Sequence, residues 1–275
     1  MKYPRPLAIA ALAAAALTPA ESRASIIAED SFTYTVGEDM SGQDGGSGWS
    51  GGWVVTSSTN GTPHHHVSAG LDQSGGALNL GSDNATTGGN GVRRDLATPV
   101  SSGVVWGSIL VRGNSVESGD FFIDTTGQFD SSVGKKWGSE FSLANDGSNG
   151  VSCSQGDIHL MVWKIDIDGG VTSLWLNPAD QSSEVGLGTP DRTKNSTIDP
   201  VDQVAVSVQR YNSAPNYDFD DIRLGTELAD VANTIPTPGP PGPDPVSPAD
   251  AATGVLLDAQ LQWTSLSANE WDVYF

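Results

Sequence analysis

Short runs of alternating apolar and polar residues recur along this chain. In residues 158–167, Met161, Trp163 and Ile165 fall on one face of an extended chain and mostly polar or aliphatic residues on the other. In residues 203–209, three valines point one way and polar or small residues the other. A period of two is typical of antiparallel strands that bury one face.

Clusters of Gly, Ser, Asn and Asp separate these runs, as in the turn predicted at 166–170, and no long segment has the 3.6-residue period of a helix. About eleven strands are predicted. They span residues 26–34, 53–56, 77–80, 92–96, 104–112, 121–125, 139–143, 158–167, 172–176, 203–211 and 217–225. So many strands without intervening helices predict an all-β fold, a two-sheet antiparallel jelly-roll sandwich.

The two ends of the chain differ from this pattern. Lys2 and Arg5 precede an apolar run at 7–17, and small residues stand at Ser22 and Ala24. This order is typical of a cleaved signal peptide, so we expect an N-terminal signal helix over residues 1–24 and a secreted or extracellular protein. No other segment approaches the roughly 18 apolar residues of a membrane span.

At the other end, seven prolines crowd into residues 236–248, which predicts an extended spacer over 234–248. Residues 249–275, with Trp263, look like the opening of a fibronectin type III or immunoglobulin-like domain; a disordered tail is the alternative. Such a fold needs about 100 residues, so we expect this piece to be a fragment of one. The jelly roll itself is expected to span 25–233, with anchoring to the cell surface through a further C-terminal region.

The net charge of the chain bears on which kinds of molecule it can bind. The chain has 13 Lys and Arg against 33 Asp and Glu, a formal net charge of −20. Phosphate binding needs clustered cations, so this acidic composition argues against a nucleic-acid partner. The one cysteine, Cys153, cannot form an internal disulfide, and no local His suggests a catalytic role for it.

Ordered short motifs give a resemblance. They are E-D-S-F-T-Y at 29–34, G-Q-D-G-G-S-G-W-S-G-G-W at 42–53, H-L-M-V-W-K-I-D-I-D-G-G at 159–170 and Y-D-F-D-D-I-R-L-G-T at 217–226. Together they resemble the laminin-G-like, concanavalin A-like jelly-roll domains of exported bacterial proteins, which often carry a PEP-CTERM sorting tail. That tail is not found in these residues. The resemblance covers about 26–233 and implies the fold; the fold itself hosts lectins, adhesion modules and glycoside hydrolases.

Catalytic carboxylates are the first chemistry to consider. Retaining glycosidases need two carboxylates about 5 Å apart, and laminarinase-type enzymes of the resembled fold carry E-x-D-x-x-E. The string is absent, and Glu140 has no acidic partner two residues on. We therefore expect a non-catalytic module that binds carbohydrate or extracellular matrix within a larger protein. A laminarinase-like glycoside hydrolase and a structural surface protein without a ligand are the alternatives.

Aromatic side chains supply the candidate contacts for a polysaccharide or other surface glycan, because indole faces stack on sugar rings. Trp49 and Trp53 lie in the glycine-rich run and Trp137 beside a strand, so these three are the candidate ligand-binding residues. The competing interpretation places tryptophans in the core of the sandwich.

Calcium is the candidate cofactor, because hard cations take carboxylate and carbonyl oxygens. Asp218, Asp220 and Asp221 are the candidate ligands, with an Asp221–Arg223 ion pair as the competing role; Asp124–Thr125 is one of several other oxygen-rich loops. Three adjacent histidines at 64–66 cannot converge on one ion if extended, and we expect a loop there.

Overall fold

The computed structural model describes most of the predicted jelly roll. It covers residues 25–58, 63–71, 75–82, 88–114, 119–127, 131–135, 140–143, 150–152, 154, 156–210, 216–236, 244–247 and 262–264. The predicted signal helix at 1–24 lies outside these residues. In the part that is described, no helix is long and apolar enough to cross a membrane.

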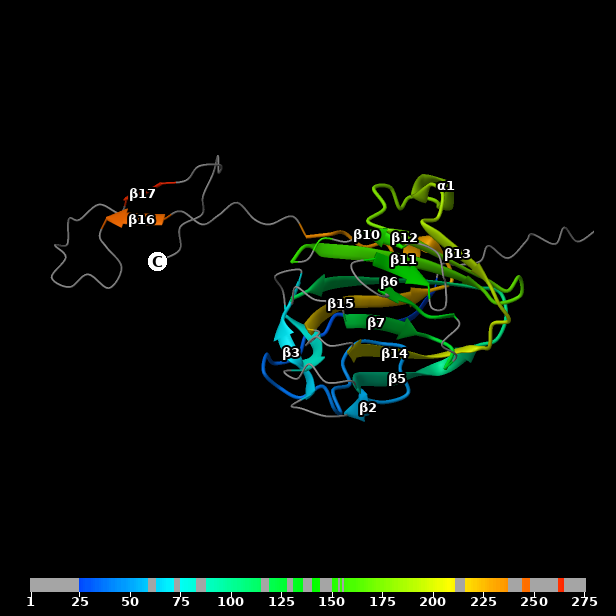
Figure 1. The fold of residues 1–275 in the computed structure, drawn as a ribbon, viewed down its shortest axis with the longest axis horizontal. Coiled ribbons are helices and arrows are strands. Elements are labelled where there is room, and N and C mark those ends of the chain that lie inside the picture. The colour runs from blue at the N-terminus through cyan, green and yellow to red at the C-terminus, as the bar shows by residue number, and fades with distance from the viewer. Residues whose placement is uncertain are drawn as a thin grey trace, which may run out of the picture.

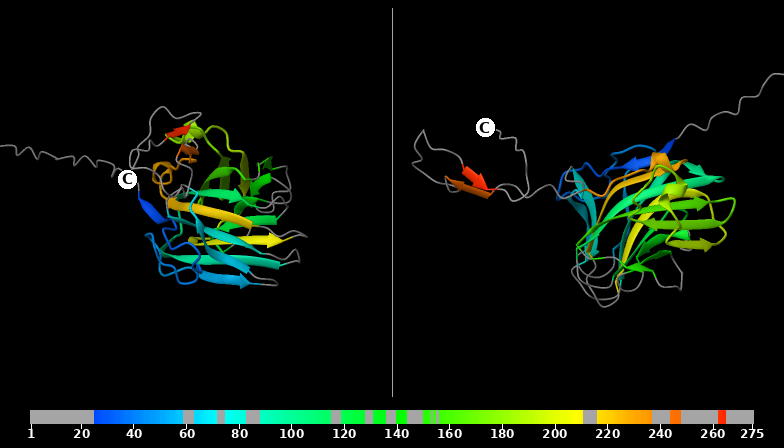
Figure 2. Two further views of the ribbon diagram at one scale, coloured as in Figure 1. Left: turned by 90° about the vertical axis from the view of Figure 1, so that its left-hand side faces the viewer. Right: turned by 90° about the horizontal axis from the view of Figure 1, so that it is seen from above.

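Two antiparallel sheets face each other (Figures 1 and 2). The eight-stranded sheet runs β13 (Arg192–Asn195), β12 (Val171–Leu176), β11 (Ile158–Asp166), β6 (Val104–Gly113), β15 (Asn216–Gly225), β4 (Gly76–Ser82) and β3 (Pro63–Ala69), with β1 (Ile26–Asp30) paired to β15. The seven-stranded sheet runs β10 (Val151–Ser152), β9 (Glu140–Leu143), β8 (Val133–Lys135), β7 (Gly119–Asp124), β14 (Val201–Arg210), β5 (Gly88–Val100) and β2 (Val54–Ser58). The predicted all-β sandwich is confirmed.

Each predicted strand overlaps an observed one, and the differences lie at ends and in short strands. The strand predicted at 26–34 stops at Asp30, because Phe32 has a positive φ of 49° and turns the chain away. The loop expected at the histidines is wrong. They lie in β3, which pairs with β4 from Pro63 to Ala69. The strands β8, β10 and β13 were also missed, because they are short and their sequences are not strongly apolar.

The predicted inner faces pack together in one core. Met161, Trp163 and Ile165 of β11 and the valines of β14 are all buried between the sheets. Space there is tight, since a Cβ on Gly107 of the neighbouring strand β6 would lie 2.2 Å from the indole of Trp163. Alternation in the sequence therefore identified the core side of both strands correctly.

The opposite face of β11 was predicted to be more polar, but its middle is buried too. Leu160 and Val162 join a second cluster with Trp106 and Trp175, whose rings stack 5.7 Å apart. Residues of the short helix α1 (Glu184–Leu187) and of the 3₁₀ turn η2 (Leu228–Asp230) cover this cluster. The eight-stranded sheet is thus apolar on both sides along part of its width, and the rest of its outer face is polar.

The glycine-rich run between β1 and β2 follows the N-terminal strand closely. Gly46 and Gly48 both have positive φ, and a Cβ on either would lie 2.0 Å from a carbonyl oxygen of β1. Trp49 donates from Nε1 to the Glu29 carbonyl at 2.9 Å. Glycine is therefore required at both positions by backbone conformation and by space.

A buried ion pair joins the two sheets beneath this loop. Arg94 of β5 lies 2.7 Å from Asp30 of β1, and their side chains are only 2% and 1% exposed. The same carboxylate oxygen accepts from Trp53 Nε1 at 2.9 Å and from the Tyr34 hydroxyl at 2.6 Å. Arg94 also donates to the carbonyls of the glycine-rich run at residues 45 and 51. Both charges are therefore paired and hydrogen-bonded.

A separate two-stranded sheet pairs β16 (Asp244–Ser247) with β17 (Gln262–Thr264). β16 falls inside the range predicted as a spacer, and β17 contains Trp263. The spacer boundaries and the fibronectin type III or immunoglobulin-like assignment of 249–275 stay predictions, as does disorder as its alternative.

The neighbouring arginines of β5 provide a matched test of the buried pair. We expect Arg94→Met to lower the free energy of unfolding by about 3–5 kcal/mol, because it leaves the Asp30 carboxylate buried without a cation. Arg93→Met removes an exposed pair with Asp95, whose side chains are 43% and 53% exposed, and should cost about 0–1 kcal/mol. Urea unfolding followed by tryptophan fluorescence measures both; equal losses would contradict a dominant role for the buried pair.

Candidate ligand-binding site

The three predicted calcium ligands lie on β15, but a bulge separates them. Phe219 and Ile222 both point into the core although they are three residues apart, because Asp220–Asp221 inserts an extra residue and shifts the register against β6. Asp221 has a positive φ of 51° there. Asp218 and Asp220 lie on the outer face of β15, opposite to Tyr217 and Phe219 in the core.

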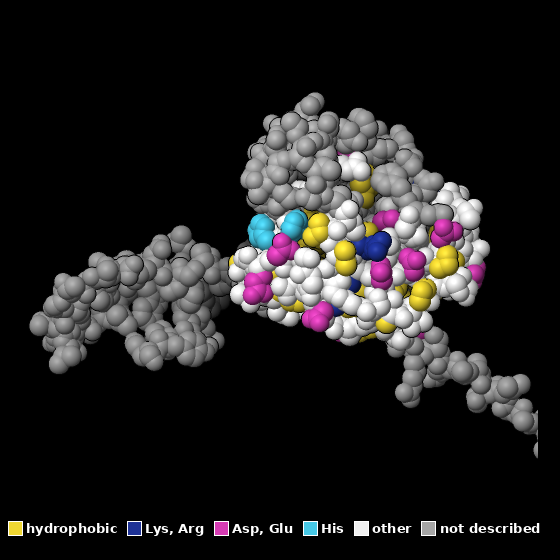
Figure 3. All heavy atoms as spheres, turned by 90° about the horizontal axis from the view of Figure 1, so that it is seen from below, with side chains coloured by type: hydrophobic (Ala, Val, Ile, Leu, Met, Phe, Trp, Pro, Cys, Tyr) yellow, Lys and Arg dark blue, Asp and Glu magenta, His cyan; other side chains and the backbone are white. Residues whose placement is uncertain are grey.

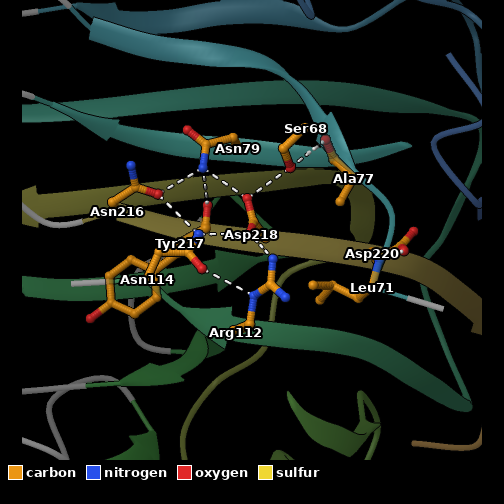
Figure 4. A network of polar contacts seen from close by, with 10 residues as sticks. All are labelled: Ser68, Leu71, Ala77, Asn79, Arg112, Asn114, Asn216, Tyr217, Asp218 and Asp220. Atoms are coloured by element: carbon orange, nitrogen blue, oxygen red, sulfur yellow. Dashed lines mark hydrogen bonds and ion pairs between the residues drawn. The ribbon is translucent and has the colours of Figure 1, made fainter. Parts of the chain in front are cut away.

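Asp218 is the centre of a saturated hydrogen-bond network (Figure 4). Its Oδ1 accepts from Ser68 Oγ and Asn79 Nδ2, each at 2.8 Å. Its Oδ2 accepts from Arg112 at 2.8 Å and Asn114 Nδ2 at 2.6 Å. Four donors, from β3, from β4 and from β6 and the residue after it, occupy this buried carboxylate, so its role is to position its neighbours.

The other two acids are also engaged by protein donors. Asp220 accepts from the backbone N–H of Leu71 and of Asp221, each at 2.8 Å. Asp221 forms the expected ion pair with Arg223 at 2.9 Å. Among the described residues, no group of three or more His, Cys, Asp or Glu side chains could hold a metal ion. The structure therefore does not assemble Asp218, Asp220 and Asp221 into a calcium site.

The two predicted tryptophans that the structure describes, Trp49 and Trp53, do not form an open stacking platform. Trp53 is 1% exposed and stacks on Phe32 with ring centroids 5.7 Å apart, so a sugar cannot reach it. Trp49 is half-buried, with the Arg94 guanidinium 5.1 Å from its ring centroid and its Nε1 engaged by the backbone. Both serve to anchor the glycine-rich run. Trp137 lies outside the described residues.

A cavity of about 610 Å³ lies next to the Asp218 network. Residues of the eight-stranded sheet and of the segments that cross its outer face line it. They are Gly70, Leu71, Arg112, Ser154, Gly156, Asp157, Ile158, His159, Asn177, Ile235 and Pro236. The lining combines a guanidinium, a carboxylate, an imidazole and an amide with aliphatic side chains, which is the composition of a site for a small polar ligand.

Hydrogen bonds fix the polar floor of this cavity. His159 Nε2 lies 2.9 Å from the Ser154 carbonyl, and Nδ1 lies 3.0 Å from Asn177 Nδ2. Because Asn177 Oδ1 accepts from the Leu160 N–H at 2.8 Å, its amide nitrogen must face the ring. In this arrangement Nδ1 accepts from the amide and Nε2 donates to the carbonyl, so both ring nitrogens are engaged.

Arg112 and Asp157 add the charged groups. Arg112 is held by Asp218 and, through Nε, by Asn114 Oδ1 at 3.0 Å, yet 33% of its side chain stays exposed. Asp157 is exposed and accepts from the Ser154 hydroxyl. The site thus presents a fixed cation and a more accessible carboxylate on one rim.

Sequence reasoning missed Arg112, His159 and Asn177 because nothing in their local sequence marks them. Pairing brings them together: Ile158 of β11 lies opposite Arg112 of β6, and Asn177 follows β12. Only the sheet register, which a single sequence does not specify, could have identified this group.

The oxygen-rich turn at Asp124–Thr125 has a different character. Burial raises the pKa of Asp124, and the nearby charge of Asp202 adds to the rise. Burial likewise raises the pKa of Asp202, with a further contribution from Asp95. Like charges are therefore held together here at the cost of stability.

No protein-family model and no curated protein matches this chain. Among solved structures, a sialidase is similar with a TM-score of 0.46 and 10% identity, over 62% of this chain and 16% of that one. Domain 4 of the extracellular arabinanase AbnA from Geobacillus stearothermophilus has a TM-score of 0.46 and 16% identity, over 76% of this chain and 99% of that domain. The Lotus tetragonolobus seed lectin has a TM-score of 0.39 and 10% identity, over 62% of this chain and 91% of the lectin. None of these likenesses assigns a function.

The raised pKa of Asp202 predicts how stability depends on pH. A carboxyl whose pKa is raised by folding contributes stability at low pH that is lost as the pH rises through its folded pKa. Asp202→Asn should therefore raise Tm at pH 7 and change it little at pH 2.5.

Asp180 provides the control of opposite sign. Hydrogen bonds from Ser182 lower its pKa, so Asp180→Asn should lower Tm at pH 7 and not at pH 2.5. Thermal melts at the two pH values check both variants. A fall in Tm for Asp202→Asn at pH 7 would contradict the inferred repulsion.

Proposed function

We propose that the sandwich is a non-catalytic module that binds carbohydrate, a polysaccharide or other surface glycan, in the cavity beside the Asp218 network. The observation that carries this proposal is the convergence of Arg112, Asp157, His159 and Asn177 on one cavity with an aliphatic wall. Arg112 and His159 lie on strands β6 and β11, and Asp157 and Asn177 lie directly beside the ends of β11 and β12, so paired strands hold the group more firmly than one loop would.

The size of the cavity supports a small saccharide or the end of a longer one. About 610 Å³ lies within the 300–1,000 Å³ range of pockets for small molecules. Hydroxyl groups of a sugar can accept from Arg112 and donate to Asp157, while Leu71 and Ile158 can cover the C–H groups of the ring. Because Asp218 and Asn114 already fix the guanidinium, little side-chain entropy is lost on binding.

The arrangement of acids favours binding over hydrolysis. Both retaining and inverting glycosidases place two carboxyl groups across the scissile bond. Among the residues that line the cavity, Asp157 alone carries a carboxylate, and the nearby Asp218 is saturated by four donors. Glu140 accepts from the Gly150 N–H at 2.7 Å, on the other sheet.

The formal net charge of −20 fits a ligand that is not a polyanion. On the face shown in Figure 3, acidic side chains are spread among uncharged atoms and basic ones are few. We further propose that this module is exported and displayed within a larger multidomain protein, on the basis of the residues at 1–24 and the proline-rich segment.

Glycan-array binding by the full chain, followed by calorimetry on the best saccharide, tests the proposal. We expect Asp157→Ala and Arg112→Lys each to weaken binding about tenfold, because hydrogen bonds to charged groups are worth about 1.5–3 kcal/mol. The matched controls are Asp44→Ala, an exposed acid in the glycine-rich run, and Arg93→Lys, whose exposed ion pair lies on the other sheet. Both should bind like the wild type.

Two outcomes would overturn this function. Failure to bind any glycan would favour a structural surface protein without a ligand. A reducing-sugar assay that detects turnover of a β-glucan, abolished by Glu140→Gln, would instead show a glycoside hydrolase.

A further inference from the structure

The chain leaves the sandwich across the rim of the cavity. After η2, residues 231–236 (here called the exit segment) run over the outer face of the eight-stranded sheet. Val231 is fully buried in the second apolar cluster, beside Leu228. The start of the exit segment is therefore anchored by apolar packing.

Polar contacts hold its middle. Gln181 donates from Nε2 to the Asn233 carbonyl at 2.5 Å and accepts from the Asn233 N–H at 3.1 Å. Arg223 donates to the Ala232 carbonyl at 2.8 Å. Asn233 Nδ2 donates to the Asp221 carbonyl in the bulge at 3.4 Å. The segment is thus attached at two successive residues, Ala232 and Asn233, to strand β15 and to the segment that precedes α1.

Its end has a different environment. Ile235 and Pro236 line the cavity together with Arg112, His159 and Asn177, and Ile235 is 37% exposed. After Asn233, the described contacts of the segment are mainly apolar and lie at the cavity. A molecule in the cavity would therefore meet the last described residues of the exit segment.

We infer that the exit segment is a wall of the ligand site, so that saccharide binding and the position at which the chain leaves the sandwich are coupled. Ile235 and Pro236 contact the C–H face of the sugar, and Gln181 is a positioning residue that acts through Asn233. This inference rests on the proposed carbohydrate binding. By linkage, a ligand that contacts the segment stabilises its docked position, and loosening the segment weakens the ligand to the same degree.

The coupling predicts that the exit segment is less mobile when the site is occupied. Segments held by a few surface hydrogen bonds open more readily than core strands. With an empty site the end of the exit segment is held mainly through the hydrogen bonds of Ala232 and Asn233, whereas an occupied site adds apolar contacts at Ile235 and Pro236. Ligand binding would then fix the position from which the chain continues after Pro236.

Calorimetry and hydrogen exchange on the full chain test this inference, with laminarihexaose, cellohexaose and xylohexaose as probes. We expect Gln181→Ala and Ile235→Ala each to weaken the bound probe about fivefold, the equivalent of roughly 1 kcal/mol for one net hydrogen bond or partial burial of an aliphatic side chain. Amide exchange in residues 231–235 should slow on binding. Gln43→Ala, which removes a glutamine bonded to a backbone carbonyl in the glycine-rich run, is the control and should leave affinity unchanged.

The outcomes separate the two proposals. If a probe binds and Asp157→Ala weakens it, but Gln181→Ala, Ile235→Ala and the exchange rates show no effect, the exit segment is no part of the site and carbohydrate binding stands. If no probe binds to the wild type, both proposals fall. A loss of near-UV circular dichroism in Gln181→Ala would mean that this variant is misfolded. The test then depends on Ile235→Ala alone, whose side chain is partly exposed and whose loss should not disturb the fold.

Discussion

The Asp30–Arg94 pair is the constraint around which the N-terminal third of this sandwich is organised. Two charges buried between sheets are stable only if every donor and acceptor is used. Arg94 therefore requires carbonyls, which the glycine-rich run supplies, and Asp30 requires further donors, which Trp53 and Tyr34 supply. The cost of this arrangement is visible at Tyr34, where burial, and then the bond to Asp30, raise the pKa of the phenol.

A second buried carboxylate follows the same rule with a different result. Asp218 is also saturated, but its cation, Arg112, is one-third exposed, whereas Arg94 is enclosed. A fully enclosed pair joins the sheets. A pair at the surface fixes a guanidinium beside a cavity and leaves part of it available. The difference comes from the position of the strands, since Arg94 points between the sheets and Arg112 points away from them.

Alternation along the chain was enough to predict most of the longer strands and the inner faces of β11 and β14, because burial between two sheets demands a period of two. It could not predict that Leu160 and Val162 are buried on the outer face, because their cover comes from α1 and η2, too short to leave a periodic signal. The glycine-rich run drew attention to Trp53 as a ligand contact. Trp53 instead donates to Asp30 and stacks on Phe32. The guanidinium of Arg94 on β5 lies 6.0 Å from its ring centroid, a contact that no local pattern indicates. The cavity residues were missed for the same reason, because only strand register unites them.

The acidic stretch of β15 shows how one irregularity can shape a site without supplying a ligand group. The bulge at Asp220–Asp221 turns Asp221 towards Arg223 and exposes the Asp221 carbonyl to Asn233. Arg223 in turn holds the Ala232 carbonyl. A regular strand would place these groups one residue out of register, on the opposite face, and the exit segment would lose two of its attachments. The same strand, two residues earlier, fixes Arg112 through Asp218. Both the fixed guanidinium of Arg112 and the exit segment at the cavity therefore depend on β15, whose acids act by holding other residues in place.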